Sequence, residues 1–205
     1  VSSWPKHVLT KLPSPGTKAL YEWNDLKLNC IDTPGYIDFI GEVNGALKVA
    51  ENAVVLVEAV AGVEVGTELV WQAAGSYGRP RILVINKMDR VGADFDRVVE
   101  QMRQRINANP VAIQIPMGAA EQFAGVIDLI TMEAVTFVGE HGVEVQTDTI
   151  PASWLDEANT ARVRMLEQLA MHDDALMSCL LENELPSESL IKSAIRRATL
   201  SRQIT

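Results

Sequence analysis

The chain contains only two cysteines among 205 residues, Cys30 and Cys179. Two cysteines are too few for a disulfide framework, so we expect a reducing, cytoplasmic location. The sequence also lacks any apolar run close to the roughly 18–20 residues that cross a bilayer. Residues 1–16 contain three prolines and no apolar period, so they are not a credible signal peptide. We therefore expect no membrane partner.

Basic residues are scarce as well. Eighteen Lys and Arg stand against 27 Asp and Glu, which gives a net charge of −9. Such an acidic chain is a poor candidate for a nucleic-acid surface, which needs clustered basic side chains. The adjacent Arg196 and Arg197 are more typical of a solvated helix face than of a binding patch. We expect no direct sequence-specific binding of nucleic acid.

The apolar pattern alternates between extended and helical periods in the first half of the chain. Residues 18–32 predict a hairpin that turns at Asn24 and Asp25. The Val-rich run 53–59 is typical of a parallel strand buried on both faces, and the apolar run 81–86 predicts another buried strand. Helices are expected at about 37–50 and 67–77, and a third helix is expected after an N-cap at Asp94. The inward side chains of the second helix are predicted to be Leu69, Val70, Ala73 and Tyr77. This order predicts an α/β fold with a mostly parallel sheet.

The pattern changes after Pro110. Four short strand-like pieces broken by glycine predict a small antiparallel sheet, and three helices are expected at about 154–170, 175–181 and from Ser187. We interpret His172-Asp173-Asp174 as a helix end with capping acids rather than a metal site. The predicted organisation is an irregular segment at 1–17, a partial first domain at 18–109 and an inserted α+β subdomain at 110–205.

Two polar motifs follow predicted strands, where open parallel sheets bind their ligands. Asp32-Thr33-Pro34-Gly35 follows one strand, and Asn86-Lys87-Met88-Asp89 follows another, 54 positions later. Each motif is weak on its own. Their order and their shared position at strand ends make structural coincidence improbable. Three other acids nearby are interpreted as solvated surface: Glu58, Glu64 and Glu68.

The second motif has the chemistry of a guanine reader. The carboxylate of Asp89 can accept two hydrogen bonds from the N–H and amine edge that guanine has and adenine lacks. The amide of Asn86 can donate to the ring, and the stem of Lys87 can lie over the base. Asp32 suits a magnesium ion held directly or through water, and Gly35 allows its N–H to approach a phosphate closely.

Longer stretches resemble a known family. The sequences IDTPGYIDFIGEV, AVVLVEAVAGVEVGTE, RILVINKMDRVGADF and NANPVAIQIPMGAAEQFAGVIDLITMEAV are similar to the GTPase domain of elongation factor G, over about residues 19–197. In Tyr36 and AVAGVEVGTE the chain is most similar to the divergent factor-G-like paralogues. The resemblance implies a P-loop NTPase-type sheet with an inserted α+β subdomain. It also implies GTP hydrolysis coupled to ribosomal translocation, with GTP or GDP and Mg²⁺ bound, and the ribosome as partner of the intact parent protein.

The phosphate loop G-x-x-x-x-G-K-[ST] is missing from these residues. The resemblance places the strand that carries it between the strands ending at Asp32 and about Ala59. We therefore expect a fragment of a larger protein, whose sheet lacks that strand and ends before the last strand. Alone, such a fragment is expected to bind GTP weakly or not at all.

Tyr36 stands where the resembling family has a histidine that orients the attacking water. A phenol is no base at neutral pH, although its hydroxyl can donate or accept a hydrogen bond. The histidines present, His7, His141 and His172, do not match that position. Two interpretations stay open: a water-orienting or gating phenol, and an aromatic that packs beside the nucleotide. The alternatives for function are a GTP-dependent ribosome-binding module with weak hydrolysis and an inactive truncated fragment.

Overall fold

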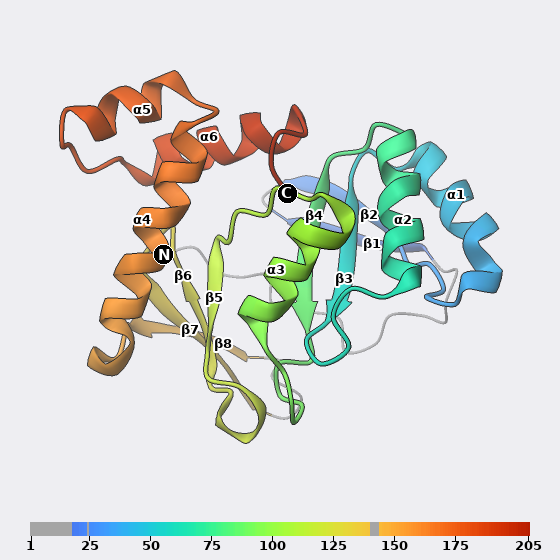
Figure 1. The fold of residues 1–205 in the computed structure, drawn as a ribbon, viewed down its shortest axis with the longest axis horizontal. Helices are drawn as coiled ribbons and strands as arrows, with labels where there is room; N and C mark the ends of the chain where they lie inside the picture. Colours follow the sequence, from blue (N-terminus) through green and yellow to red (C-terminus); the bar gives the residue numbers. More distant parts are fainter. Residues whose placement is uncertain (1–17, 24, 140–143) are drawn as a thin grey trace.

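The computed structural model describes residues 18–23, 25–139 and 144–205 (Figure 1). The irregular segment predicted at 1–17 lies outside these residues, as do His7 and His141. The predicted hairpin is confirmed: β1 (Lys18–Trp23) pairs antiparallel with β2 (Leu26–Ile31). Asp25 between them has a φ of 61°, the left-handed conformation that tight hairpin turns require.

The parallel strands β3 (Ala53–Glu58) and β4 (Arg81–Asn86) pair from Ala53 opposite Arg81 to Glu58 opposite Asn86. The predicted parallel pairing is thus confirmed for these two strands, and among the described residues they form a sheet of their own. β2 pairs with β1 instead of joining this sheet. The carboxyl ends of β3 and β4 lie in register at one edge, which brings the residues after each strand together.

Helices cover one face of the β3–β4 sheet. They are α2 (Val65–Ser76) and α3 (Phe95–Ile106), preceded in the chain by the short η1 (Ile37–Phe39) and by α1 (Ile40–Val49). The N-cap predicted at Asp94 is confirmed, since its carboxylate accepts the amide of Arg97 at 2.9 Å. The core beneath α2 and α3 contains Val55, Val57, Val63, Trp71, Val98, Met102, Ile106 and Ala108.

The other face corrects the expectation of strands buried on both faces. Val54 and Leu56 are 62% and 63% exposed, whereas their neighbour Val57 is 1% exposed. Ile82 and Val84 of β4 add 50% and 40% exposed side chains to the same uncovered face. The described residues place helices on one side of this sheet only, so alternate side chains along each strand face solvent.

Two details of α2 also differ from the expectation. The helix begins two residues earlier than predicted, because Glu64 and Thr67 form a capping box in which the Glu64 amide donates to the Thr67 hydroxyl at 3.3 Å. Its buried side chains are Trp71 and Ala74. The four predicted inward residues are only half-buried: Leu69, Val70, Ala73 and Tyr77.

The predicted antiparallel sheet of the second half is confirmed. Its strands are β5 (Gln114–Met117), β6 (Gly125–Asp128), β7 (Glu133–Val138) and β8 (Glu144–Thr149), hydrogen-bonded in that order. Two short turns of helix accompany this sheet: η2 (Ala120–Gln122) connects β5 to β6, and η4 (Ala152–Trp154) lies between β8 and the helix that follows it. Figure 1 shows α4 lying beside the sheet, with α5 and α6 at one end of the molecule.

The three expected helices are α4 (Leu155–Ala170), α5 (Asp174–Leu181) and α6 (Glu188–Leu200). Ser187 caps α6 as predicted, and Asp173 caps α5 by accepting the amide of Leu176 at 3.0 Å. These helices and the antiparallel sheet share one core, separate from that of the parallel strands. Its fully enclosed side chains are Ile127, Leu129, Ala158, Leu169, Leu176, Ile191 and Ala194.

Candidate functional site

The first motif forms the turn after β2. Asp32, Thr33 and Pro34 are half-buried and Gly35 is exposed. The carbonyl oxygen of Gly35 lies 3.8 Å from the point where a Cβ on Gly66 would sit. Because Gly66 is the second residue of α2, the turn lies against the N-terminus of that helix, where backbone N–H groups favour negative charge.

The second motif forms a tight turn after β4. Lys87 has a φ of 60°, an uncommon conformation for a residue with a side chain. The amide of Asn86 secures it, because its Oδ1 accepts the backbone N–H of Lys87 at 2.9 Å. The carbonyl of Lys87 in turn accepts the N–H of Arg90 at 3.2 Å. Asn86, Lys87 and Asp89 remain exposed at the end of the strand.

Met88 anchors this turn to the second half of the chain. Its side chain is 7% exposed, unlike its neighbours in the motif. Its carbonyl oxygen accepts the N–H of Ala120, the first residue of η2, at 2.8 Å. Sequence reasoning missed Ala120, since nothing in the linear pattern links two loops 32 positions apart. The turn is therefore fixed from both sides while its polar side chains face solvent.

Glu58 and Glu68, which were interpreted as solvated surface, are partly exposed and each forms an ion pair. Glu58, the last residue of β3, forms an ion pair with Lys87, at 3.2 Å between carboxylate oxygen and Nζ. Glu68 pairs with Arg105 of α3 at 2.7 Å. The first pair could have been predicted from the sequence, because the parallel pairing of β3 and β4 places the ends of the two strands next to each other.

The loop after β3 is held by one stripe of α3. Arg97 donates to two carbonyl oxygens of this loop, at 2.9 and 2.7 Å. Gln101 accepts the N–H of Val63 at 3.0 Å, and Arg105 donates to the carbonyl of the same residue. Since these three residues of α3 are spaced four apart, they share a face of the helix. The loop between the two motifs is thus tied to the helix that follows the second.

Tyr36 is the N-cap residue directly before the short η1, and its carbonyl accepts the N–H of Phe39 at 3.0 Å. Its side chain is 77% exposed, and Ile37 and Phe39 beside it are 50% and 47% exposed. The phenol and its apolar neighbours therefore stand open to solvent directly after the first motif.

The side chains of the first motif determine which ligands the chain could offer to a magnesium ion. Within 18–23, 25–139 and 144–205 there is no group of three or more His, Cys, Asp or Glu side chains that could hold a metal. Asp32, with the hydroxyl of Thr33 next to it, offers one carboxylate. This set fits a cation such as Mg²⁺, which keeps several waters and takes other oxygens from a phosphate.

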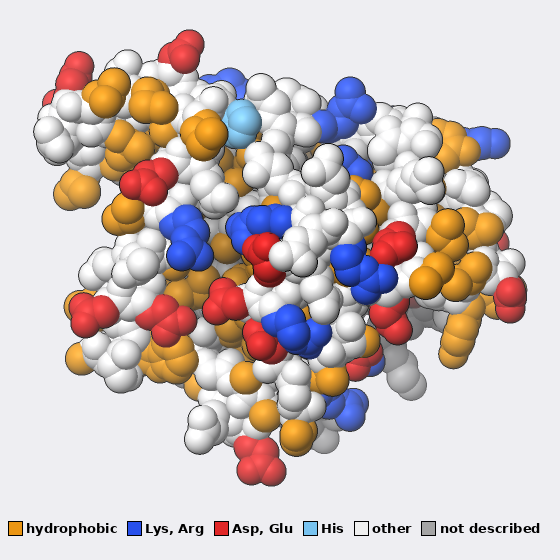
Figure 2. Space-filling model, in the orientation of Figure 1, with side chains coloured by type: hydrophobic (Ala, Val, Ile, Leu, Met, Phe, Trp, Pro, Cys, Tyr) orange, Lys and Arg blue, Asp and Glu red, His pale blue; other side chains and the backbone are white. Residues whose placement is uncertain are grey.

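The expectation for His172-Asp173-Asp174 is confirmed, because Asp173 caps α5. That carboxylate also accepts hydrogen bonds from Arg197 of α6. Arg196 and Arg197 are both exposed, as expected of a solvated helix face, and Arg197, with 57% of its side chain exposed, also forms an ion pair with Asp173. Figure 2 shows acidic and basic side chains interspersed over the middle of the face that it presents.

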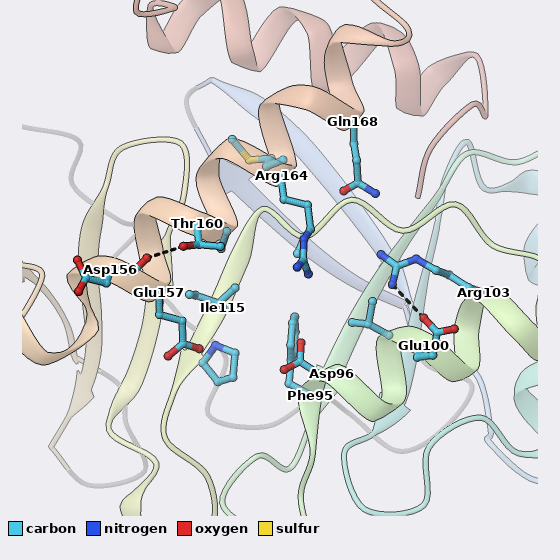
Figure 3. A pocket seen from close by; sticks show the side chains of 15 residues that line it. Phe95, Asp96, Glu100, Arg103, Ile115, Asp156, Glu157, Thr160, Arg164 and Gln168 are labelled. Carbon is cyan, nitrogen blue, oxygen red and sulfur yellow. Dashed lines mark hydrogen bonds and ion pairs between the residues drawn. The ribbon is translucent and has the colours of Figure 1, made fainter.

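A cavity of about 700 Å³ lies between α3 and α4, and none of the strand-end residues lines it. Phe95, Ile115 and Met165 contribute apolar walls. In Figure 3 the side chains of Arg103 and Arg164 reach toward its centre, while Thr160 donates to the carbonyl of Asp156 at its edge. This cavity is distinct from the strand-end site.

The helices of the described residues include none that is both long and apolar enough to cross a bilayer. The sequence matches the family described as elongation factor Tu GTP binding domain over residues 15–185. It is 45% identical over 179 residues to the elongation factor G of Fervidobacterium nodosum, covering 87% of this chain and 26% of that protein. The resemblance to elongation factor G is thereby confirmed.

A solved crystal structure of a protein from Thermus thermophilus has the same fold, with a TM-score of 0.80 at 30% identity. The similarity covers 91% of this chain and 28% of that one, and it confirms the expected α/β fold. The chain therefore spans about a quarter of the length of these relatives. Because the family match extends over most of its residues, the chain belongs to the elongation factor Tu GTP binding domain family.

Proposed function

We propose that this chain is the guanine-nucleotide-binding part of a translational GTPase that resembles elongation factor G. In the intact protein, GTP binding and hydrolysis are coupled to ribosomal translocation. Membership of a GTP binding domain family supports a guanine nucleotide as the bound ligand. The 45% identity to an elongation factor G supports the ribosome as partner and the cytoplasm as location.

The turn of Asn86 to Asp89 carries this proposal. Its backbone is fixed by the bonds of Asn86, Lys87 and Met88, while three polar side chains face solvent at the end of a parallel strand. A carboxylate at Asp89 binds two neighbouring N–H donors of guanine. An adenine base offers no such pair of donors on that edge, so the same side chain sets the specificity.

The turn of Asp32 to Gly35 is proposed to bind the phosphate end. Asp32 would hold Mg²⁺, directly or through a water, and the backbone of Gly35 would leave room for its N–H to donate to a phosphate. Thr33 and Pro34 fix the path of the chain between them. A bound magnesium ion would neutralise phosphate charge, and the position against the N-terminus of α2 adds a favourable field.

We also propose that residues 18–109 are the partial GTPase domain and that 110–205 are an inserted subdomain. Separate apolar cores support this division: one contains buried residues from Val55 to Ala108, the other from Val111 to Ile204. Phe95 of α3 packs against the second core from the first segment, so the two parts contact each other closely.

Substitution of Asp89 tests the proposed function in the full-length protein. Asn at this position can accept one hydrogen bond and donate one. It should therefore prefer xanthine, whose carbonyl replaces the amine of guanine. We expect Asp89→Asn to weaken GDP binding about 100-fold or more and to strengthen binding of xanthosine diphosphate. Asp96→Asn, on the exposed side of α3, is the control. Unchanged GDP affinity in Asp89→Asn would contradict guanine recognition by this turn.

A second candidate, a GTP-dependent ribosome-binding module with weak hydrolysis, rests on Tyr36, which stands where the resembling family has a histidine. In such a module, nucleotide binding would change the conformation of the protein with little hydrolysis of GTP. Single-turnover hydrolysis of the full-length protein with and without ribosomes separates the two: stimulation by ribosomes supports the GTPase. For the isolated 205 residues we expect little GTP binding, which calorimetry measures directly.

A further inference from the structure

We propose that Glu58 is a positioning residue, which holds the ammonium group of Lys87 in place for a guanine base. This inference rests on the proposed function of the Asn86 to Asp89 turn. It goes beyond that function because it assigns a role to an acid outside both motifs, at the end of a different strand.

The backbones that carry the two side chains are both fixed. Glu58 lies opposite Asn86 in the parallel register, and the next N–H, of Ala59, donates to the carbonyl of Asn86 at 2.8 Å. The carbonyl of Glu58 accepts the N–H of Gly62 at 2.8 Å. Lys87 follows Asn86 directly. The ion pair of 3.2 Å thus joins two rigid strand ends, so its geometry does not depend on a mobile loop.

Stability alone does not account for this pair. The side chains of Lys87 and Glu58 are 47% and 37% exposed, and ion pairs between exposed groups contribute little to folding. Lys87 also has a φ of 60°, a conformation that is unfavourable for a residue with a side chain. Such a conformation is often retained at binding sites, where the surrounding structure enforces it. The pair is better explained by what Lys87 binds.

The proposed advantage is entropic. A lysine side chain has many rotamers, and a stem that must lie along one face of a base loses them on binding. An acid that already holds the ammonium restricts these rotamers before the nucleotide arrives. Removing the acid should therefore weaken nucleotide binding through Lys87, with little change in the folded state.

The experiment compares GDP binding by calorimetry in the full-length protein and in three variants. These are Glu58→Gln, Lys87→Met, which keeps an apolar stem without the charge, and the double variant. We expect Glu58→Gln to weaken GDP binding about 2- to 10-fold. The same substitution in the Lys87→Met background should have no effect, because the group it positions is gone. High salt should reduce the effect of Glu58→Gln.

Glu188→Gln is the matched control, because Glu188 pairs with Lys192 at 2.9 Å on the exposed side of α6. It should leave GDP affinity unchanged. Wild-type affinity in Glu58→Gln, combined with weakened binding in Lys87→Met, would overturn the positioning role and leave the proposed function standing. An equal loss in both backgrounds would also overturn it, since Glu58 would then act independently of Lys87. Absence of GDP binding by the wild type would overturn the proposed function and this inference together.

Discussion

Arg197 of α6 donates two hydrogen bonds to the buried carboxylate of Asp173, one of them 2.8 Å from its Nε. Asp173 is 6% exposed and also accepts the N–H of Leu176 as the N-cap of α5. Burial by itself raises the pKa of Asp173, but the hydrogen bonds from Arg197 and Leu176 outweigh it and lower the pKa below its ordinary value. One carboxylate thus joins the start of α5 to α6.

This contact predicts a pH-dependent contribution to stability. Because the pKa of Asp173 is lower in the folded state, its contribution is present above the unfolded value of about 3.9 and is lost as the pH falls through the folded value. Asp173→Asn keeps a capping side chain but loses the charge. We expect it to destabilise the fold by about 1–2 kcal/mol at neutral pH. Urea unfolding of the wild type and of Asp173→Asn at pH 7 and pH 3 measures the difference in their free energies of unfolding. The same difference at both pH values would contradict a contribution from the charge of Asp173.

The stacking of Arg81 on Trp71 yields a second prediction. The guanidinium lies 3.7 Å from the centroid of the indole and donates to the carbonyl of Trp71 at 3.2 Å. Burial lowers the pKa of Arg81, and the charge of Arg202 lowers it further. A lysine cannot reproduce the planar stack, so Arg81→Lys should destabilise the fold by about 1 kcal/mol.

The control for this prediction is Arg103→Lys. Arg103 pairs with Glu100 three residues earlier on α3, at 3.4 Å, and the two side chains are 36% and 54% exposed. A lysine can replace such a contact at little cost. Chemical denaturation should separate the two variants, and equal midpoints for Arg81→Lys and wild type would show that the stack contributes nothing.

The elements that follow from the sequence are those with local causes. The cap at Asp94 and the apolar period of Val98, Met102 and Ile106 place α3 within one or two residues. The strand ends that carry the two motifs follow from short apolar runs, LKLNCI before the first motif and RILVIN before the second. Burial of a strand is different, because it depends on what covers each face. Val54 and Leu56 have the same side chains as a buried strand, yet they are exposed.

The contacts that sequence reasoning missed are those between distant segments. The Glu58–Lys87 pair needs the parallel register, and the bond from Ala120 to Met88 needs the path of the insert. The Asp173–Arg197 pair joins the N-cap residue of α5 to a residue of α6 that is 24 positions away, and the two meet only in the folded chain. In each case the residue types alone are equally compatible with solvated surface, so only the fold identifies the partner.

Tyr36 yields a third prediction, for the full-length protein. GTP binding should be retained, since the exposed phenol lies outside the turn proposed to read guanine. Ribosome-stimulated hydrolysis should be altered relative to Tyr36→His, because an imidazole can act as a base at neutral pH and a phenol cannot. Single-turnover hydrolysis on ribosomes measures this difference. Equal rates in the two proteins would show that position 36 does not limit the reaction.

The face of the β3–β4 sheet that none of the described helices covers carries the last prediction, for the isolated 205 residues. Val54, Leu56, Ile82 and Val84 lie 40–63% exposed on one side of two neighbouring strands. Contiguous apolar surface of this kind favours association. We expect the isolated chain to self-associate in sedimentation velocity, and Leu56→Lys to shift it toward monomer, because a charge on this face must stay hydrated.

Val91→Lys is the matched control for that substitution. Val91 is 82% exposed, but it lies in the loop after the Asn86 to Asp89 turn, outside the sheet face. Val91→Lys adds the same charge to the chain as Leu56→Lys. If the sheet face causes the self-association, Val91→Lys should leave the self-association unchanged. A shift of equal size in both variants would assign the effect to net charge. A wild-type chain that stays monomeric throughout would show that this face does not bind another copy.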